Sequence, residues 1–496
     1  MGRLIVVLGR ETSMGWLRRA LFDTTGTRRQ RRRRRPLRKA VTMGAGLALV
    51  AAGSVLALPP QGAAADTPHY DGDPTQYWNG VLLELFRLTG GEAGSPGRLS
   101  RSAAMMNAAI YDGESAYQNT FYTLRYKPYL SAPKYWNLGQ GADEEERIIG
   151  RTAYNILHAL YPDQTAFLDQ KFLYRFGTPS TQYDIIDTEI VGTIVNNMLQ
   201  ARSNDGWDDS RLYTLQDVPG AWRPTGEPGC TTVGDAVTPD WGLVTPFTMS
   251  SGSAYRPTTP GSFADYASLL ASPAYAYQVD QVRRLGGRGS AERTAEQTAI
   301  ATFWANDLGP DATHKGTFKP PGQLLDATIS IARARVQSKY ENTRLFALVS
   351  LAMADAAIGE WDVKYQTPID LWRPVSAIHN GIDPSWQPLS AARDGSPLTP
   401  CFPAWASGHA AFAGGWAAVM TSYFGSDAMT FTVNTEDPAS PQKTRTFTSF
   451  HQAAQEDADS RVYLGVHYPW DATDGLKLGD DVATKAVLPR LAPIGS

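Results

Sequence analysis

Apolar residues in this chain recur at helical rather than alternating spacing. The first clear run contains Val81, Leu82, Leu85 and Phe86, which follow the three- and four-residue steps of one helix face. The stretch between residues 148 and 160 repeats this periodicity. A strand would instead show a two-residue alternation. The hydrophobic pattern therefore predicts a protein built mainly from α-helices.

The C-terminal half repeats the helical pattern several times. The expected helices there are residues 291–306, 323–338, 343–364, 407–424, 449–465 and 472–487. Because the apolar stripe of one helix must be covered by another, we expect these helices to pack as a bundle. A chain of 496 residues is too long for one ordinary core, which favours a doubled bundle. Residues 430–448 alternate instead, so the predicted fold is all-α with long irregular connectors and at most a small β-hairpin.

Residues 206–261 differ from the rest of the chain. They are rich in proline, glycine, threonine and tryptophan and show no clear periodicity. Such composition is typical of an irregular connector. We therefore expect an N-terminal helical half over residues 66–205 and a C-terminal helical half over residues 262–496, which carries the candidate chemistry.

The N-terminal residues 1–65 have the order of an export signal. A basic run from Arg31 to Arg35 precedes an apolar stretch over residues 41–58, and three alanines follow at residues 63–65. The basic run is similar to a twin-arginine motif. A membrane anchor is the alternative, since about 18 apolar residues can just span a bilayer. The many small residues favour a cleaved signal, a secreted or cell-envelope location and no stable membrane insertion after cleavage.

The overall composition excludes some classes of partner. The hydrophobic share of 42% and the charged share of 19% are those of a soluble globular protein, and a net charge of −3 gives no general attraction to nucleic acid. Cys230 and Cys401 are the two cysteines of the chain. They could form one disulfide or remain as two buried thiols, and neither has the spacing of a metal site.

Three short segments of the C-terminal half combine groups that bind an oxyanion. The first contains Lys364 and Arg373. Lys364 offers a compact positive charge and Arg373 a planar fork of donors, which together suit a multiply charged oxygen anion. A solvated helix end with a surface lysine is the alternative, because exposed Lys and Arg are the rule.

The second segment is Ser407, Gly408 and His409, where a turn rich in proline and small residues enters a predicted helix. The N–H groups of a helix start favour an anion, Gly408 lets it approach the backbone, and Ser407 adds a hydroxyl donor. His409 can exchange a proton near neutral pH. Alternatively, Ser407 only caps the helix and His409 is an ordinary core histidine.

The third segment runs from Arg461 to Asp471. Arg461 and His467 are six residues apart, which is off one face of a regular helix, so His467 is expected where the helix ends before Pro469. There it can project one ring nitrogen while Asp471 holds the other. Asp471 could equally cap the next helix, and the two roles are compatible.

In this order, these segments resemble the three-part signature of the phosphatidic acid phosphatase type 2 and vanadium haloperoxidase superfamily. The resemblance covers the chain from residue 303 onward, and the third segment is its most specific part. It implies an α-helical bundle, doubled in the haloperoxidase branch, with few strands.

Further residues resemble the haloperoxidase branch. Trp361 stands three residues before Lys364, and Phe402 stands five before the serine, as aromatic residues do in fungal-type vanadium chloroperoxidases. Asp307 lies in a segment similar to one whose aspartate pairs with the anion-binding arginine. The spacing from Lys364 to Arg373 is two residues longer than is usual in the family. Either this loop bulges, or Lys364 is displaced from the site.

The resemblance implies a vanadate-dependent haloperoxidase, which uses hydrogen peroxide to oxidise halide to hypohalous acid that halogenates a small organic acceptor. His467 would bind vanadate as the metal ligand, and His409 would act as its acid/base partner. An acid phosphatase with His467 as nucleophile is the alternative, and an inactive binding protein is a third. Oligomeric state is left open. The groups expected to share the charge of the oxyanion are Lys364, Arg373, Ser407, the Gly408 N–H and Arg461.

Overall fold

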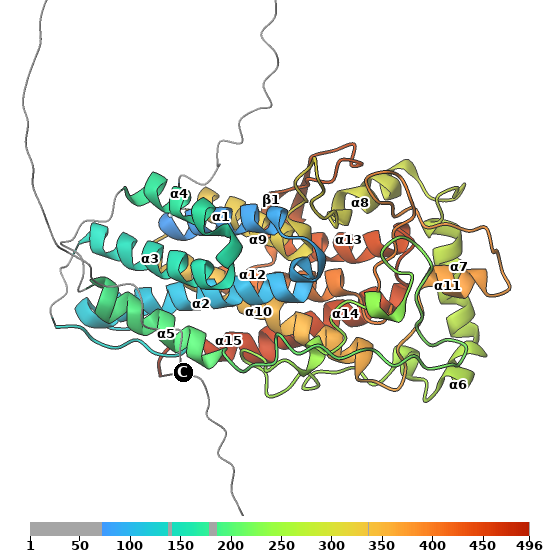
Figure 1. The fold of residues 1–496 in the computed structure, drawn as a ribbon, viewed down its shortest axis with the longest axis horizontal. Coiled ribbons are helices and arrows are strands. Elements are labelled where there is room, and N and C mark those ends of the chain that lie inside the picture. The colour runs from blue at the N-terminus through green and yellow to red at the C-terminus, as the bar shows by residue number, and fades with distance from the viewer. Residues whose placement is uncertain (1–71, 137–140, 178–185, 336, 496) are drawn as a thin grey trace, which may run out of the picture. The chain divides into compact units, whose positions relative to one another are not determined.

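Helices carry the fold, and segments far apart in the sequence lie side by side within it (Figure 1). A computed structural model describes residues 72–136, 141–177, 186–335 and 337–495. The predicted export signal, residues 1–65, lies outside the described residues. The N-terminal helices are α1 (Pro74–Leu88), α2 (Pro96–Phe121), α3 (Ala142–Leu160), α4 (Thr165–Phe176) and α5 (Gly192–Ala201).

The C-terminal half adds further helices and a two-stranded antiparallel sheet. The predicted all-α fold with a small hairpin is thus confirmed. The strands are β1 (Ala428–Asn434) and β2 (Thr444–Ser449). The helices are α6 (Tyr266–Leu270), α7 (Pro273–Gly286), α8 (Ala295–Ala305), α9 (Lys319–Ala334), α10 (Lys339–Tyr365), α11 (Pro374–His379), α12 (Gly408–Phe424), α13 (Phe450–Tyr463), α14 (Pro469–Val482) and α15 (Leu488–Arg490).

Helix α10 lies at the centre of the described bundle. It begins with a capping box, in which the Ser338 hydroxyl accepts from the Glu341 N–H and the Glu341 carboxylate accepts from the Ser338 N–H, each at 3.2 Å. Its residues are buried on all sides, which is typical of a helix enclosed by others. It packs against α2 on one side and against α12 and α14 on the other (Figure 1).

Four predicted helix starts differ from the observed ones by three or four residues. α8 begins at Ala295 rather than residue 291, and α10 begins at Lys339 rather than residue 343, each after a capping box. Prolines explain the other two differences. α9 begins at Lys319 rather than residue 323, and α14 begins at Pro469 rather than residue 472. Each of these starts has proline in its first turn, where the missing N–H would have no intrahelical acceptor. The periodic apolar residues alone placed both starts too late.

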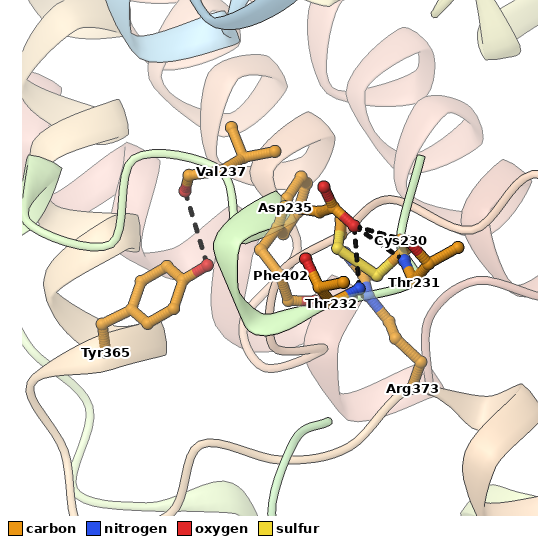
Figure 2. Close-up of a disulfide and its surroundings, with 9 residues drawn as sticks. Cys230, Thr231, Thr232, Asp235, Val237, Tyr365, Arg373 and Phe402 are labelled. Carbon is orange, nitrogen blue, oxygen red and sulfur yellow. Dashed lines mark hydrogen bonds between the residues drawn. A yellow bond between two sulfur atoms is a disulfide. The ribbon is translucent and has the colours of Figure 1, made fainter. Parts of the chain in front are cut away.

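The predicted connector, residues 206–261, contains only short 3₁₀ turns. Two internal anchors hold it on the bundle. The buried carboxylate of Asp355 accepts hydrogen bonds from the backbone N–H groups of Phe247 (2.6 Å) and Thr248 (2.7 Å). A disulfide joins Cys230 to Cys401, with the two Cα atoms 5.2 Å apart (Figure 2). Of the two possibilities for the cysteines, the structure contains the disulfide.

Helices α12 and α14 approach closely through small residues. A Cβ atom added at Gly479 would clash with the Ala411 carbonyl oxygen and lie 2.5 Å from the Gly415 nitrogen. A Cβ added at Gly475 would lie 2.6 Å from the Ser407 carbonyl oxygen. These glycines let the start of α12 sit directly against α14.

Within the described ranges, no helix has both the length and the hydrophobicity needed to cross a bilayer.

The close approach of α12 and α14 predicts that Gly479→Ala destabilises the fold. The added methyl group must push apart two backbones rather than a flexible side chain, so we expect a loss of about 1–3 kcal/mol in the free energy of unfolding. Denaturant unfolding measures it. Gly289→Ala is the matched control, because a Cβ there has no atom within 4 Å. Equal unfolding midpoints for the two variants would contradict the close packing.

The disulfide predicts a second stability effect. It closes a loop of 171 residues, and such a cross-link stabilises a protein by about 2–4 kcal/mol, mainly by restricting the unfolded chain. The double variant Cys230→Ser with Cys401→Ser should therefore unfold at a lower denaturant concentration, and a reducing agent should have the same effect on the wild type. An unchanged midpoint in both experiments would show that the bond contributes nothing.

Candidate active site

The second and third segments meet at one cavity of about 300 Å³. Arg373 and Lys364 of the first segment are not part of its wall, but Arg373 contacts His467, which is. The cavity wall contains residues from both halves of the chain, including Gly90 and Pro96 near the start of α2. Apolar groups form much of the rest. The lining residues that the sequence analysis singled out are Asp307, Trp361, Phe402, Gly408, His409, Arg461 and His467.

His467 lies in the short loop between α13 and α14, as the spacing predicted. After Tyr463 the chain turns through Gly465, whose φ of 82° is the left-handed conformation that glycine tolerates. The backbone N–H groups of Val466 and His467 then both donate to the Arg461 carbonyl, at 3.1 and 3.3 Å. This loop holds the His467 backbone beside the last turn of α13.

The neighbours of His467 fix which ring nitrogen carries the proton. Nδ1 lies 3.0 Å from Oδ2 of Asp471, and the same oxygen accepts the Tyr468 N–H at 3.0 Å. Nε2 lies 3.2 Å from Nη1 of Arg373, which can only donate. Nδ1 is therefore the protonated nitrogen, and Nε2 presents its lone pair. Burial and the cations Arg373 and Lys364 lower the pKa of His467 well below its usual value.

Arg373 precedes α11 and is completely buried. Its Nε donates to the Phe402 carbonyl at 2.6 Å, and Nη1 donates to the Val466 carbonyl at 2.8 Å as well as facing His467. The guanidinium lies over the Phe402 ring, 4.5 Å from its centroid. Burial lowers the pKa of Arg373 to about 10, which leaves it charged at neutral pH.

Arg461 approaches the cavity from the last turn of α13. Its Nη2 lies 3.0 Å from Oδ2 of Asp307, which follows the end of α8. Asn306 adopts the left-handed conformation there, with φ of 41°, so the chain turns and carries Asp307 toward α13. The ion pair between Asp307 and Arg461 joins α8 to α13 at the cavity wall.

His409 lies in the first turn of α12 and lines the same cavity. Its Nε2 is 3.9 Å from Oδ1 of Asp307. Burial, followed by the charge of Arg461, lowers the pKa of His409 well below its usual value. The imidazole is therefore neutral at pH 7 and can accept a proton.

The start of α12 supplies backbone donors to the site. Ser407 caps the helix, since its hydroxyl accepts from the Ala410 N–H at 3.5 Å, and its own N–H donates to the Asp471 carbonyl at 3.0 Å. Gly408 follows as the first helical residue and lines the cavity. Because the first N–H groups of a helix have no intrahelical acceptor, this end of α12 favours an anion.

Lys364 is near the other cations but does not line the cavity. Its Nζ donates to the carbonyls of Pro403 (2.8 Å) and Ala404 (3.2 Å) and also to that of Ala406. It also lies 2.7 Å from a carboxylate oxygen of Glu360. Lys364 shares its absence from the cavity wall with Arg373, and its full burial excludes a surface lysine.

Trp361 and Phe402 form the aromatic part of the wall, with ring centroids 5.1 Å apart. Both residues are linked to the connector. The Trp361 indole N–H donates to the Val237 carbonyl at 3.1 Å, and the Val237 N–H donates to the Cys401 carbonyl at 3.0 Å. The disulfide at Cys401 thus lies directly beside Phe402 (Figure 2).

Several buried donors converge on the site without a hydrogen-bond partner among the described residues. A buried donor without a partner costs about 1–3 kcal/mol, so such a cluster indicates a missing acceptor. An oxyanion supplies several acceptor oxygens and the compensating negative charge. The unpartnered donor atoms are Nη2 of Arg373 and Nε and Nη1 of Arg461. Nε2 of His409 is also unpartnered and can accept a proton.

The sequence analysis missed Glu360, a buried carboxylate beside Lys364. A signal was available, because Glu360 and Lys364 have the four-residue spacing of ion pairs on one helix face. Asp457 on α13 has the same four-residue spacing from Arg461 and is also buried. Both acids lie one turn before a cation of the site.

Comparison with known proteins gives relatives of one kind. A family model described as the VCPO second helical-bundle domain matches residues 344–491. Vanadium chloroperoxidase from Curvularia inaequalis is 26% identical to this chain, over 83% of this chain and 81% of that protein.

Solved structures show the same fold. The first bacterial vanadium-dependent iodoperoxidase superposes with a TM-score of 0.68 at 24% identity, covering 85% of this chain and 96% of its own. A holo-type bacterial vanadium-dependent chloroperoxidase superposes with a TM-score of 0.62 at 16% identity, covering 81% and 94%. Together with the order of the three segments, these likenesses lead to one conclusion: the chain has the fold of the vanadium-dependent peroxidases, is similar to vanadium chloroperoxidase over most of its length, and matches that family's second helical-bundle domain over residues 344–491.

Proposed function

We propose that this chain is a vanadate-dependent haloperoxidase that oxidises a halide with hydrogen peroxide to hypohalous acid. The observation that carries the proposal is the cluster of unpartnered donors on Arg373 and Arg461, with the unpartnered Nε2 of His409, around the lone pair of His467 Nε2. These are the groups that a tetrahedral oxyanion with one nitrogen ligand requires.

The residues of the site fit vanadate in two respects. His467 offers Nε2 as the single protein ligand, because Asp471 holds the proton on Nδ1. Arg373, Arg461 and the start of α12 offer donors to the oxygens of the anion. Bound vanadate supplies a Lewis-acidic centre that activates hydrogen peroxide toward halide.

His409 is the acid/base group in this proposal. Its pKa is depressed by burial and by Arg461, so the neutral ring can take a proton from hydrogen peroxide and return it to the leaving oxygen. Negative charge brought in by the oxyanion opposes the effect of Arg461 and makes the protonated ring easier to form. The ring therefore has access to both states during turnover.

The cavity in front of these residues accommodates the other reactants. Its apolar wall suits a halide of low hydration and a small organic acceptor, and it limits the entry of bulk water. The wall residues that supply this character include Pro96, Val237, Trp361, Leu398, Pro400, Phe402 and Phe412.

We also propose that the chain acts outside the cytoplasm, as a secreted or cell-envelope protein. The order of basic, apolar and small residues over residues 1–65 supports export. The disulfide between Cys230 and Cys401 supports an oxidising compartment.

The proposal predicts halogenation that depends on vanadate and on His467. The full chain incubated with orthovanadate should halogenate a phenolic dye in the presence of hydrogen peroxide and bromide. His467→Ala should reduce the rate to that of the solution without protein, because the nitrogen ligand is lost. His314→Ala is the control and should keep the wild-type rate, since His314 is an exposed residue paired with Asp311.

The His409→Ala variant distinguishes a loss of vanadate binding from a loss of catalysis. This variant should still bind orthovanadate but should lose at least about 100-fold in halogenation rate, in the range expected for a general acid/base. Turnover of a phosphomonoester by the wild type without vanadate, together with inhibition by vanadate, would instead support the phosphatase alternative. Vanadate binding with neither activity would support a binding protein.

A further inference from the structure

Glu360 brings a negative charge into a site whose other buried charges are mostly positive. It lies on α10 one turn before Lys364, and its side chain is fully buried. Its Oε1 lies 2.7 Å from Lys364 Nζ. Apart from this ion pair, neither carboxylate oxygen accepts a hydrogen bond from a described residue. Such a poorly solvated carboxylate is costly to bury, and burial raises the pKa of Glu360 to about 7.

Lys364 is fully occupied by these partners. An ammonium group has three N–H donors, and Lys364 Nζ faces the carbonyls of Pro403, Ala404 and Ala406 as well as the Glu360 carboxylate. Arg373, which like Lys364 is not part of the cavity wall, differs in keeping an unpartnered nitrogen, Nη2. The positive charge of Lys364 is therefore compensated inside the protein and has no donor to spare for an anion.

The Glu360 carboxylate lies beside the start of α12. A Cβ added to Gly408, the first residue of α12, would be 3.6 Å from both of its oxygens. The start of α12 is the part of the site that attracts negative charge. Glu360 therefore faces the same helix end as an incoming oxyanion would, and the two like charges repel.

Carboxylates also contact Arg461 and His467, but these contacts leave atoms of both side chains available. Asp307 pairs with Arg461 and leaves two of its nitrogens unpartnered, and Asp471 contacts the ring of His467. Both arrangements leave donors or a lone pair directed to the anion. Of the pairings described here, that of Glu360 with Lys364 is the one that leaves no unpartnered donor on its cation.

We propose that Glu360 is a specificity-determining residue of the oxyanion site, whose carboxylate neutralises Lys364 and weakens the binding of highly charged oxyanions. The inference rests on the proposed function, because it concerns the anion that the same site binds. Removing this charge should strengthen binding, since repulsion between charges a few ångströms apart in a buried site is large. A residue that only held Lys364 in position would have the opposite effect when replaced.

Calorimetric titration of the full chain with orthovanadate, and separately with inorganic phosphate, tests the proposal without any assay of activity. It is done at a pH above the pKa of Glu360, where the carboxylate carries its charge. Glu360→Gln keeps the shape of the side chain but removes its charge, and it should bind both anions at least about tenfold more tightly than the wild type. Glu360→Asp keeps the charge and should stay within about threefold of the wild type. Equal or weaker binding by Glu360→Gln would overturn the proposal.

Glu114→Gln is the matched control. Glu114 is another fully buried glutamate, on α2, and it interacts with Lys339 at the opposite end of α10 from Glu360. Its replacement should leave both affinities unchanged. An equal gain in affinity for Glu114→Gln would show a general effect of net charge and would overturn the assignment to Glu360.

The double variant Glu360→Gln with Lys364→Met provides a second test. It removes both members of the ion pair and leaves the net charge of the site unchanged, so vanadate binding should weaken by less than about tenfold relative to the wild type. A larger loss would mean that Lys364 acts on the anion directly, against the proposal. Absence of binding by the wild type and by every variant would instead defeat the proposed function itself, and the inference with it.

Discussion

The structure depends on the compensation of positive charge that is buried where three distant segments meet. Arg373 and Arg461 are almost completely inaccessible to water, and an uncompensated guanidinium could not remain there. Backbone carbonyls and the Asp307 carboxylate satisfy part of their donors. The donors that remain all lie beside His467 and His409, so the residual positive charge is concentrated at one point. In the proposed function, an oxyanion completes the set of hydrogen bonds at that point.

The helices supply the rigidity that this arrangement needs. α10 carries Trp361 and Lys364 from the centre of the bundle, and the glycines of α14 allow the start of α12 to pack directly on its backbone. The Asp471 carbonyl accepts the Ser407 N–H, so the helix start at Ser407 is tied to the residue that orients His467. The anion-binding end of α12 and the ligand nitrogen are therefore fixed relative to one another by backbone contacts.

Much of the fold followed from the sequence because the relevant signals are local. Helical periodicity and the alternating stretch identified the helices and the hairpin, and the break of α13 before Pro469 placed His467 in a loop. Helix starts were less predictable where proline replaces an apolar residue, as at Pro320 in α9. The disulfide could not be predicted, since nothing local brings Cys230 near Cys401.

The sequence predicted which residues would come together better than it predicted how their side chains are directed. The residue types at Arg373, His409 and Arg461 indicated an anion, and the structure brings these residues together. The direction of Lys364 could not be derived, because it depends on carbonyls of the segment before α12 and on Glu360, whose four-residue spacing was the one local signal.

A crystal structure of the full chain soaked with orthovanadate, with vanadium located by its anomalous scattering, tests the central claim most directly. We expect the vanadium atom to be bonded to Nε2 of His467, with its oxygens in hydrogen-bond contact with Arg373, Arg461 and the Gly408 N–H. Vanadium bound elsewhere, or absent from the cavity while Nε2 of His467 stays paired with Arg373, would contradict it.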